Sequence, residues 1–152
     1  MENNRKLIIA IIIILIAAIG IFSYIQYQDS FSSIKLGKTT FKIPEGYKQV
    51  ESDDNNTVNI NNGKKLIYIS SKGNGDFNKT IQDYVNTFEE NNRPTIVTNF
   101  TVDNVLVYKL SLKNESACYY WFKNNGELYN IYKWGKTGDI ETEVFDLIRT
   151  MK

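Results

Sequence analysis

The sequence predicts an α+β protein, with an N-terminal transmembrane helix followed by a mainly antiparallel sheet flanked by two amphipathic helices. Three observations lead to this fold class. An uncharged run, Leu7 to Ile25, lies near the start of the chain. Two later segments carry apolar residues at the spacing of one helix face. The runs around them alternate between apolar and polar residues and are joined by short turn sequences, as antiparallel strands are.

The uncharged run has the length of a membrane span. Its nineteen residues extend about 28 Å as a helix, close to the hydrocarbon thickness of a bilayer. Arg5 and Lys6 precede the run and Asp29 follows it. Basic residues favour the cytoplasmic side of a membrane. We therefore expect a single-pass cell-membrane protein whose N-terminus is cytoplasmic and whose C-terminal domain lies outside.

Two other readings of this run are open. Ala18-Ile19-Gly20 has the small residues that a signal peptidase recognises, but the run is longer than the usual signal-peptide core. A type IV pilin also begins with an apolar helix, but the glutamate typical of pilins is missing from this segment. No cysteine directly follows the run, which excludes a lipoprotein anchor.

The expected division of the chain into domains follows from the position of this apolar run. Residues 1–28 form a cytoplasmic tip and transmembrane signal-anchor helix, residues 29–33 a short stalk, and residues 34–152 an extracytoplasmic domain. Without Glu2, Arg5 and Lys6, sixteen basic residues balance sixteen acidic ones. This neutral balance argues against nucleic acid or an anionic membrane surface as the main partner of the domain. The expected partners are the membrane, through the helix Leu7 to Ile25, and an envelope protein.

Composition also excludes several chemistries. The chain has no histidine and a single cysteine, Cys118, so histidine-based triads, histidine metal sites and internal disulfides are excluded. Cys118 lies in an apolar run and is expected to be a small buried residue. We therefore expect no catalytic residues, no metal and no cofactor. A hydrolase using Asp53 and Asp54 is the weakest alternative, because it needs two carboxylates converging in a cleft.

The first half of the domain reads as strands followed by a helix. Ile34–Gly37 and Thr39–Ile43 alternate, and Pro44 ends the second run. Thr57–Ser71 reads as a hairpin around Asn62-Gly63, a pair that suits a type I′ turn. This loop places Ile60 opposite Lys65 and Val58 opposite Ile67, with one face formed by Val58, Ile60, Ile67 and Ile69. Asp76 or Asn78 then caps a helix to about Asn91, whose apolar stripe is Phe77, Ile81, Tyr84, Val85 and Phe88.

The second half reads as four antiparallel strands and a terminal helix that is capped by Asp139. The expected strands are Thr95–Phe100, Val105–Leu112, Ala117–Lys123 and Glu127–Trp134. With Asn125-Gly126 as the last hairpin loop, Tyr120 pairs with Ile131 on one face and Tyr119 pairs with Tyr132 on the other. Both faces are aromatic, so we expect each to be covered in part by a helix or by the N-terminal strands.

The order of elements and the segment Phe41-Lys42-Ile43-Pro44-Glu45-Gly46-Tyr47 resemble the Mog1/PsbP-like fold. This resemblance covers nearly all of Ile34 to Lys152. It implies an exported domain that serves for binding or assembly, as members of this fold mostly do. No functional residue is carried over from it, because fold alone does not give function.

One set of residues stands out as a candidate ligand or partner site. Tyr119, Trp121, Tyr132 and Trp134 lie on one face of the last hairpin, where aromatic rings can stack against a ligand. The leading hypothesis is a non-enzymatic, membrane-anchored binding or assembly module for an envelope partner. The second is a receptor for a small glycan or peptide on this aromatic face.

Overall fold

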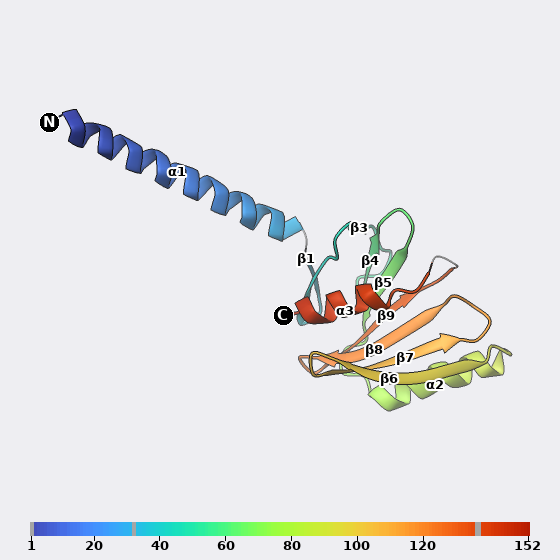
Figure 1. The fold of residues 1–152 in the computed structure, drawn as a ribbon. Coiled ribbons are helices and arrows are strands. Elements are labelled where there is room, and N and C mark those ends of the chain that lie inside the picture. The colour runs from blue at the N-terminus through green and yellow to red at the C-terminus, as the bar shows by residue number, and fades with distance from the viewer. Residues whose placement is uncertain (1, 32, 136–137) are drawn as a thin grey trace. The chain divides into compact units, whose positions relative to one another are not determined.

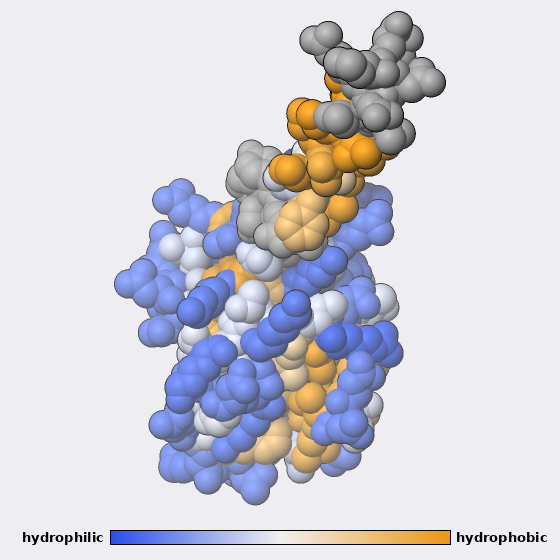
Figure 2. Space-filling model, turned by 90° about the vertical axis from the view of Figure 1, so that its left-hand side faces the viewer, coloured by the Kyte–Doolittle hydropathy of each residue, from blue (hydrophilic) through white to orange (hydrophobic). Residues whose placement is uncertain are grey.

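The computed structural model describes residues 2–31, 33–135 and 138–152, and in the first helix only the side chains of residues 9 and 11–25. The chain divides into two compact units between Ser33 and Ile34. The first unit contains helix α1 (Glu2–Phe31). Its large apolar side chains between Ile11 and Ile25 are 49–66% exposed, and they appear in orange in Figure 2.

Helix α1 reaches further than the predicted anchor. It continues through Phe31, so residues 29–31, which were assigned to the stalk, are helical. No glycine or proline lies between Ile21 and Leu36 to end the helix earlier. Within the described residues, no helix combines the length and apolar character required to cross a membrane.

The second unit is an α+β domain built on a seven-stranded antiparallel sheet (Figure 1), in the order β3-β4-β5-β9-β8-β7-β6. Two further strands form a separate small sheet, and two helices complete the domain. The elements are β1 (Ser33–Leu36), β2 (Thr39–Lys42), β3 (Lys48–Val50), β4 (Thr57–Asn61), β5 (Leu66–Ser71), α2 (Phe77–Glu90), β6 (Thr95–Val102), β7 (Val105–Leu112), β8 (Cys118–Asn124), β9 (Glu127–Lys133) and α3 (Glu141–Thr150).

Both faces of the large sheet are covered, as predicted. Helix α3 and the β1–β2 sheet pack on one face, around residues such as Phe41, Tyr120 and Leu147. Helix α2 packs on the other face, where Ile81 and Phe88 contact a second apolar cluster. Figure 1 shows the two helices on opposite sides of the sheet. This arrangement explains why both sides of β8 and β9 carry large apolar residues.

The first hairpin has a different register from the predicted one. Ile60 lies opposite Ile67 and Val58 opposite Ile69, so the pairing is shifted by two residues. The side chain of Asn62 accepts hydrogen bonds from the backbone N–H groups of Lys64 and Lys65, which closes a four-residue loop. A shift of two residues keeps each side chain on its face. The predicted shared face is therefore correct, and all four of its residues are buried.

The last hairpin has the predicted register. Tyr120 pairs with Ile131 and Tyr119 with Tyr132 across β8 and β9. Asn125 and Gly126 form the loop with φ angles of 50° and 78°, the left-handed conformation that a type I′ turn requires. This register fixes which aromatic residues share a face.

The two helices differ in how they begin. The carboxylate of Asp76 accepts the backbone N–H of Lys79 at 2.6 Å, so Asp76 is the N-cap of α2 as predicted. The prediction that Asp139 caps α3 is wrong, because Ile140 holds the N-cap position and makes no side-chain cap. The Asp139 carboxylate instead accepts hydrogen bonds from Tyr120 at 2.7 Å and from Lys109 at 2.9 Å. It ties the start of α3 to the sheet.

Candidate functional site

A row of stacked aromatic rings crosses the α2 side of the sheet. Tyr68 of β5 stacks on Tyr132 of β9, with ring centroids 4.7 Å apart and planes at 9°. Tyr132 stacks on Tyr119 of β8 at 5.7 Å, and Tyr119 stacks on Trp121 at 5.7 Å. The first two contacts are directly opposed cross-strand pairs. Offset-stacked rings attract one another beyond their burial, so the row is a rigid surface.

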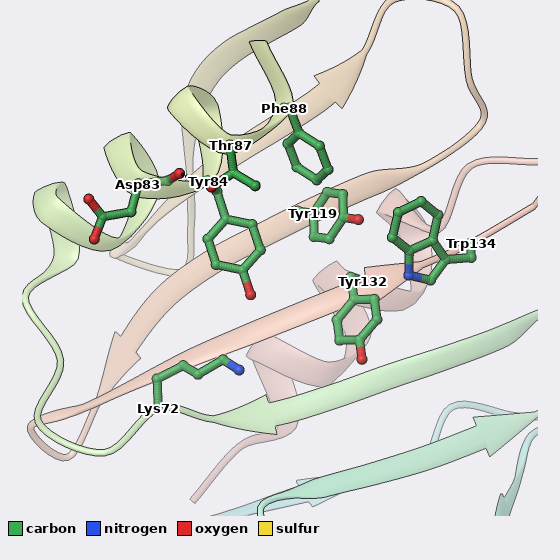
Figure 3. Close-up of a pocket in the computed structure, with 8 residues that line it drawn as sticks. All are labelled: Lys72, Asp83, Tyr84, Thr87, Phe88, Tyr119, Tyr132 and Trp134. Carbon is green, nitrogen blue, oxygen red and sulfur yellow. Dashed lines mark hydrogen bonds between the residues drawn. The ribbon is translucent and has the colours of Figure 1, made fainter. Parts of the chain in front are cut away.

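A pocket of about 430 Å³ lies between this row and helix α2. Helix α2 contributes Asp83, Tyr84, Thr87 and Phe88, and Lys72 follows β5. The sheet side contributes Tyr119, Tyr132 and Trp134. Figure 3 shows the aromatic side chains grouped around the hollow, with Lys72 reaching toward it from the end of β5. Mostly aromatic walls with a few polar groups are typical of small-molecule sites.

The structure brings three of the four predicted site residues to this pocket. Trp134 is 46% exposed, and Tyr132 is half-buried. Tyr119 is buried but its ring lines the pocket. Trp121 is fully buried and does not line the pocket; the ring of Tyr84 from α2 lies 5.1 Å from it, edge to face. The proposed flat platform therefore does not include an accessible Trp121, because α2 covers that end of the aromatic row.

Arg93 holds the exposed tryptophan in place. Its guanidinium lies 5.2 Å from the ring centroid of Trp134 and 4.8 Å from that of Phe88. The same group donates to the carboxylate of Glu115, with Nε 2.6 Å from Oε1. A planar guanidinium stacks well on aromatic faces while bonding a carboxylate in its plane. This contact positions Trp134, which remains 46% exposed.

One residue that lines the pocket has a buried hydroxyl group without a hydrogen-bond partner. The hydroxyl oxygen of Tyr119 is closed to solvent and has no partner within the described part of the chain, and the residue is only 3% exposed. Burial raises the pKa values of Tyr84, Tyr119 and Tyr132, so all three phenols remain neutral at ordinary pH. An unsatisfied buried hydroxyl costs about 1–3 kcal/mol.

Sequence reasoning missed the α2 and β5 residues of the site. The spacing of Tyr84 and Phe88 placed both in the apolar stripe of α2, without indicating which strands they cover. Tyr68 follows directly from the observed hairpin register, since it alternates with Ile67 and Ile69 and so points to the opposite face. Lys72 and Asp83 carried no sequence signal for this site.

The other candidate groups stay outside the pocket. Cys118 is buried as expected, and burial together with the nearby charge of Asp139 raises the pKa of its thiol. Asp53 and Asp54 are exposed on the segment between β3 and β4. The Asp54 carboxylate accepts from the backbone of Asn56 and the hydroxyl of Thr57, which lowers its pKa. Across the described ranges, no group of three metal-binding side chains forms a metal site.

Comparison with known proteins adds a structural similarity. No family model and no curated protein matches the chain. Among solved structures, the chain is similar to cyanobacterial PsbP (CyanoP) from Synechocystis, with 11% identity over 80% of this chain and 92% of that chain and a TM-score of 0.48. It is also similar to a protein from Bacteroides thetaiotaomicron, with 13% identity over 75% of this chain and a TM-score of 0.48. The chain spans 44% of that Bacteroides protein.

Proposed function

We propose that residues 34–152 form a non-enzymatic binding module whose site is the aromatic pocket, and that α1 holds this module at the outer face of a cell membrane. The observation that carries the binding function is a pocket of about 430 Å³ whose walls are mostly aromatic side chains, including the exposed Trp134. Aromatic walls with a few polar groups are typical of small-molecule sites. The resemblance of the sequence to the Mog1/PsbP-like fold also supports a binding role.

The chemistry of the pocket favours a sugar ring over a charged ligand. The lining holds one lysine and one aspartate, so it offers no net charge. The exposed ring of Trp134 suits the C–H face of a pyranose, and the polar side chains of the lining suit the ring's hydroxyl edge. Trp134 also lines a second hollow of about 370 Å³ beside Ala117 and Gly135. A ligand spanning both hollows is elongated, and this favours an oligosaccharide.

The membrane part of the proposal rests on the sequence. The run Leu7 to Ile25 has no charge, basic residues precede it and an acidic residue follows it. The apolar side chains described in this run are exposed to their surroundings, as they are in a helix that faces lipid. Carbonate extraction of membranes and protease digestion of intact cells test this part: a pellet-bound chain with an accessible domain supports it, and extraction into the soluble fraction contradicts it.

The binding site is tested with the full-length chain in detergent. Calorimetric titration with chitotetraose and maltotetraose measures affinity, and the peptide Gly-Trp-Gly is titrated in parallel. Trp134→Ala should weaken saccharide binding by about tenfold or more, a loss of about 1.4 kcal/mol. Val50→Ala, which shortens another exposed apolar side chain on β3, should leave it unchanged.

Each outcome separates the alternatives. Saccharide binding that depends on Trp134 supports a glycan receptor. Binding of the peptide alone overturns the sugar assignment and favours a protein partner, which cross-linking in intact cells then identifies. If neither probe binds, or if Trp134→Ala binds as the wild type does, the pocket is not the site.

A further inference from the structure

Strand β6 is an unprotected end of the large sheet. It pairs with β7 on one side and is the last strand in the sheet order. Its eight residues, TIVTNFTV, contain no charge and no proline. The N–H and C=O groups on its outer side are available to another strand. Proteins usually protect such an edge with charges, proline, a bulge or a short strand.

The opposite end of the same sheet carries this protection. Strand β3 is only three residues long and includes Lys48, and Glu51 follows it directly. All three of its residues are exposed. The contrast within one sheet indicates that the open edge of β6 has a role that β3 does not share.

Apolar side chains also gather at the β6 edge. Ile96 and Val97 of β6 are 47% and 40% exposed, and Leu106 of the adjacent β7 is 45% exposed. Ile96 and Val97 are consecutive, so they lie on opposite faces of the sheet. An added strand therefore gains apolar contacts on both faces as well as backbone hydrogen bonds.

We propose that the occupant of this edge is a second copy of the chain, with β6 pairing antiparallel to β6 of the partner. The strand itself supports this occupant. An antiparallel pair centred on Thr98 brings only uncharged residues opposite one another along all eight positions, so two copies of β6 meet without charge repulsion.

This register also covers the exposed apolar residues. Ile96 comes opposite the partner's Phe100, and Val97 comes opposite the partner's Asn99, on matching faces of the sheet. The twofold axis passes through Thr98, so the two seven-stranded sheets join into one continuous sheet. The dimer uses the sheet edge and not the aromatic pocket, so it stands independently of the proposed binding function.

Two measurements on the full-length chain in detergent test the dimer. Light scattering coupled to size-exclusion chromatography gives the protein mass, which should be that of a dimer at micromolar concentration. Thr98→Lys places two like charges at the twofold axis and should give a monomer with unchanged circular dichroism. Gln49→Lys on β3 adds the same charge at the other edge and should remain a dimer. A monomeric wild type, or a dimer unaffected by Thr98→Lys, overturns the proposal.

Cysteine cross-linking tests the register and does not depend on the stability of a lysine variant. Opposed residues of an antiparallel pair have Cα atoms about 4.5–5.5 Å apart, within the range of a disulfide. Thr98→Cys should therefore form a covalent dimer under mild oxidation. Thr101→Cys, on the same strand and also exposed to solvent, should not, because residue 101 faces the partner's residue 95. Cross-linking of Thr101→Cys, or of neither variant, contradicts pairing centred on Thr98.

Discussion

Tyr119 and Tyr132 lie directly opposite each other on β8 and β9, and their rings stack at 5.7 Å with planes 16° apart. This pair forms the floor of the aromatic pocket. Because Tyr119 is fixed between Tyr132 and Trp121, its hydroxyl has little freedom to turn toward a protein partner. The stacking that makes the surface rigid therefore also leaves a polar atom unsatisfied.

Removing the Tyr119 hydroxyl should stabilise the unliganded protein. Tyr119→Phe keeps the stacked ring and deletes a buried oxygen that has no partner. We expect the free energy of unfolding to rise by about 1 kcal/mol, since an unsatisfied buried polar group costs about 1–3 kcal/mol. Urea unfolding followed by circular dichroism measures this change.

Tyr129→Phe provides the matched control on the other face. The Tyr129 hydroxyl donates to the Glu127 carboxylate at 2.7 Å and lies 3.1 Å from the Leu36 carbonyl oxygen. Its loss should lower the free energy of unfolding by about 1–2 kcal/mol, because the partners are left unsatisfied. If the two variants change stability in the same direction and by equal amounts, the Tyr119 hydroxyl has a partner in solution.

The fold was predictable where local chemistry allows one solution. Asn125-Gly126 accepts left-handed geometry at both positions, so the last hairpin has a single favourable loop and the predicted register is confirmed. In the first hairpin, the side chain of Asn62 stabilises a longer loop. Propensity alone does not reveal that competing hydrogen bond. Strand β3 was not predicted, because a three-residue exposed strand leaves no periodic pattern.

The site was predictable only in part, for a reason of packing. Residue alternation correctly places Tyr119, Trp121 and Tyr132 on one face of β8 and β9. It does not give the position of α2 across that face. Tyr84 packs onto Trp121 and buries it, while Trp134, just beyond the end of β9, remains exposed. Which aromatic residues α2 covers depends on contacts between segments far apart in the sequence, so it cannot be predicted from a short stretch of sequence.

Acid should weaken the attachment of α3 to the sheet through Asp139. Burial acts to raise the pKa of this carboxyl, but hydrogen bonds from Lys109 and Tyr120 outweigh it and lower the pKa to about 2. The ordinary value in an unfolded chain is about 3.9. The native state therefore binds this proton more weakly than the unfolded state does. The stabilisation from Asp139 is present above about pH 4 and is lost as pH falls toward 2.

Asp139→Asn removes this titration and tests it. The variant should be less stable than the wild type at pH 7, and the difference should shrink as pH falls from 4 to 2. Urea unfolding at a series of pH values measures the difference. Asp146→Asn, an exposed position on the same helix, should differ little from the wild type across this range. A constant gap between Asp139→Asn and the wild type would mean that Asp139 titrates normally in the folded protein.

Gly37 should be far less replaceable than Gly63, although both have positive φ angles, of 57° and 85°. A Cβ atom on Gly37 would clash with Oε2 of Glu127. That carboxylate is fixed by the Lys38 backbone N–H and the Tyr129 hydroxyl. A Cβ atom on Gly63 would meet nothing within 4 Å. Gly63→Ala should lower the free energy of unfolding by about 1–2 kcal/mol, the cost of a left-handed conformation for alanine. Gly37→Ala should lower it clearly more. Urea unfolding measures both changes. Equal losses would show that Glu127 moves away freely.

The two tryptophans should report different environments in fluorescence. Trp121 is fully buried beneath Tyr84 of α2, whereas Trp134 is 46% exposed under Arg93. Trp134→Phe leaves Trp121 as the emitter, so its emission should lie at shorter wavelength and resist acrylamide. Trp121→Phe leaves Trp134, whose emission should lie at longer wavelength and be quenched several-fold more strongly. Similar quenching of both variants, with circular dichroism unchanged, would mean that α2 does not stay packed on the sheet. The pocket would then lose its helical wall, because Tyr84 and Phe88 belong to the same element.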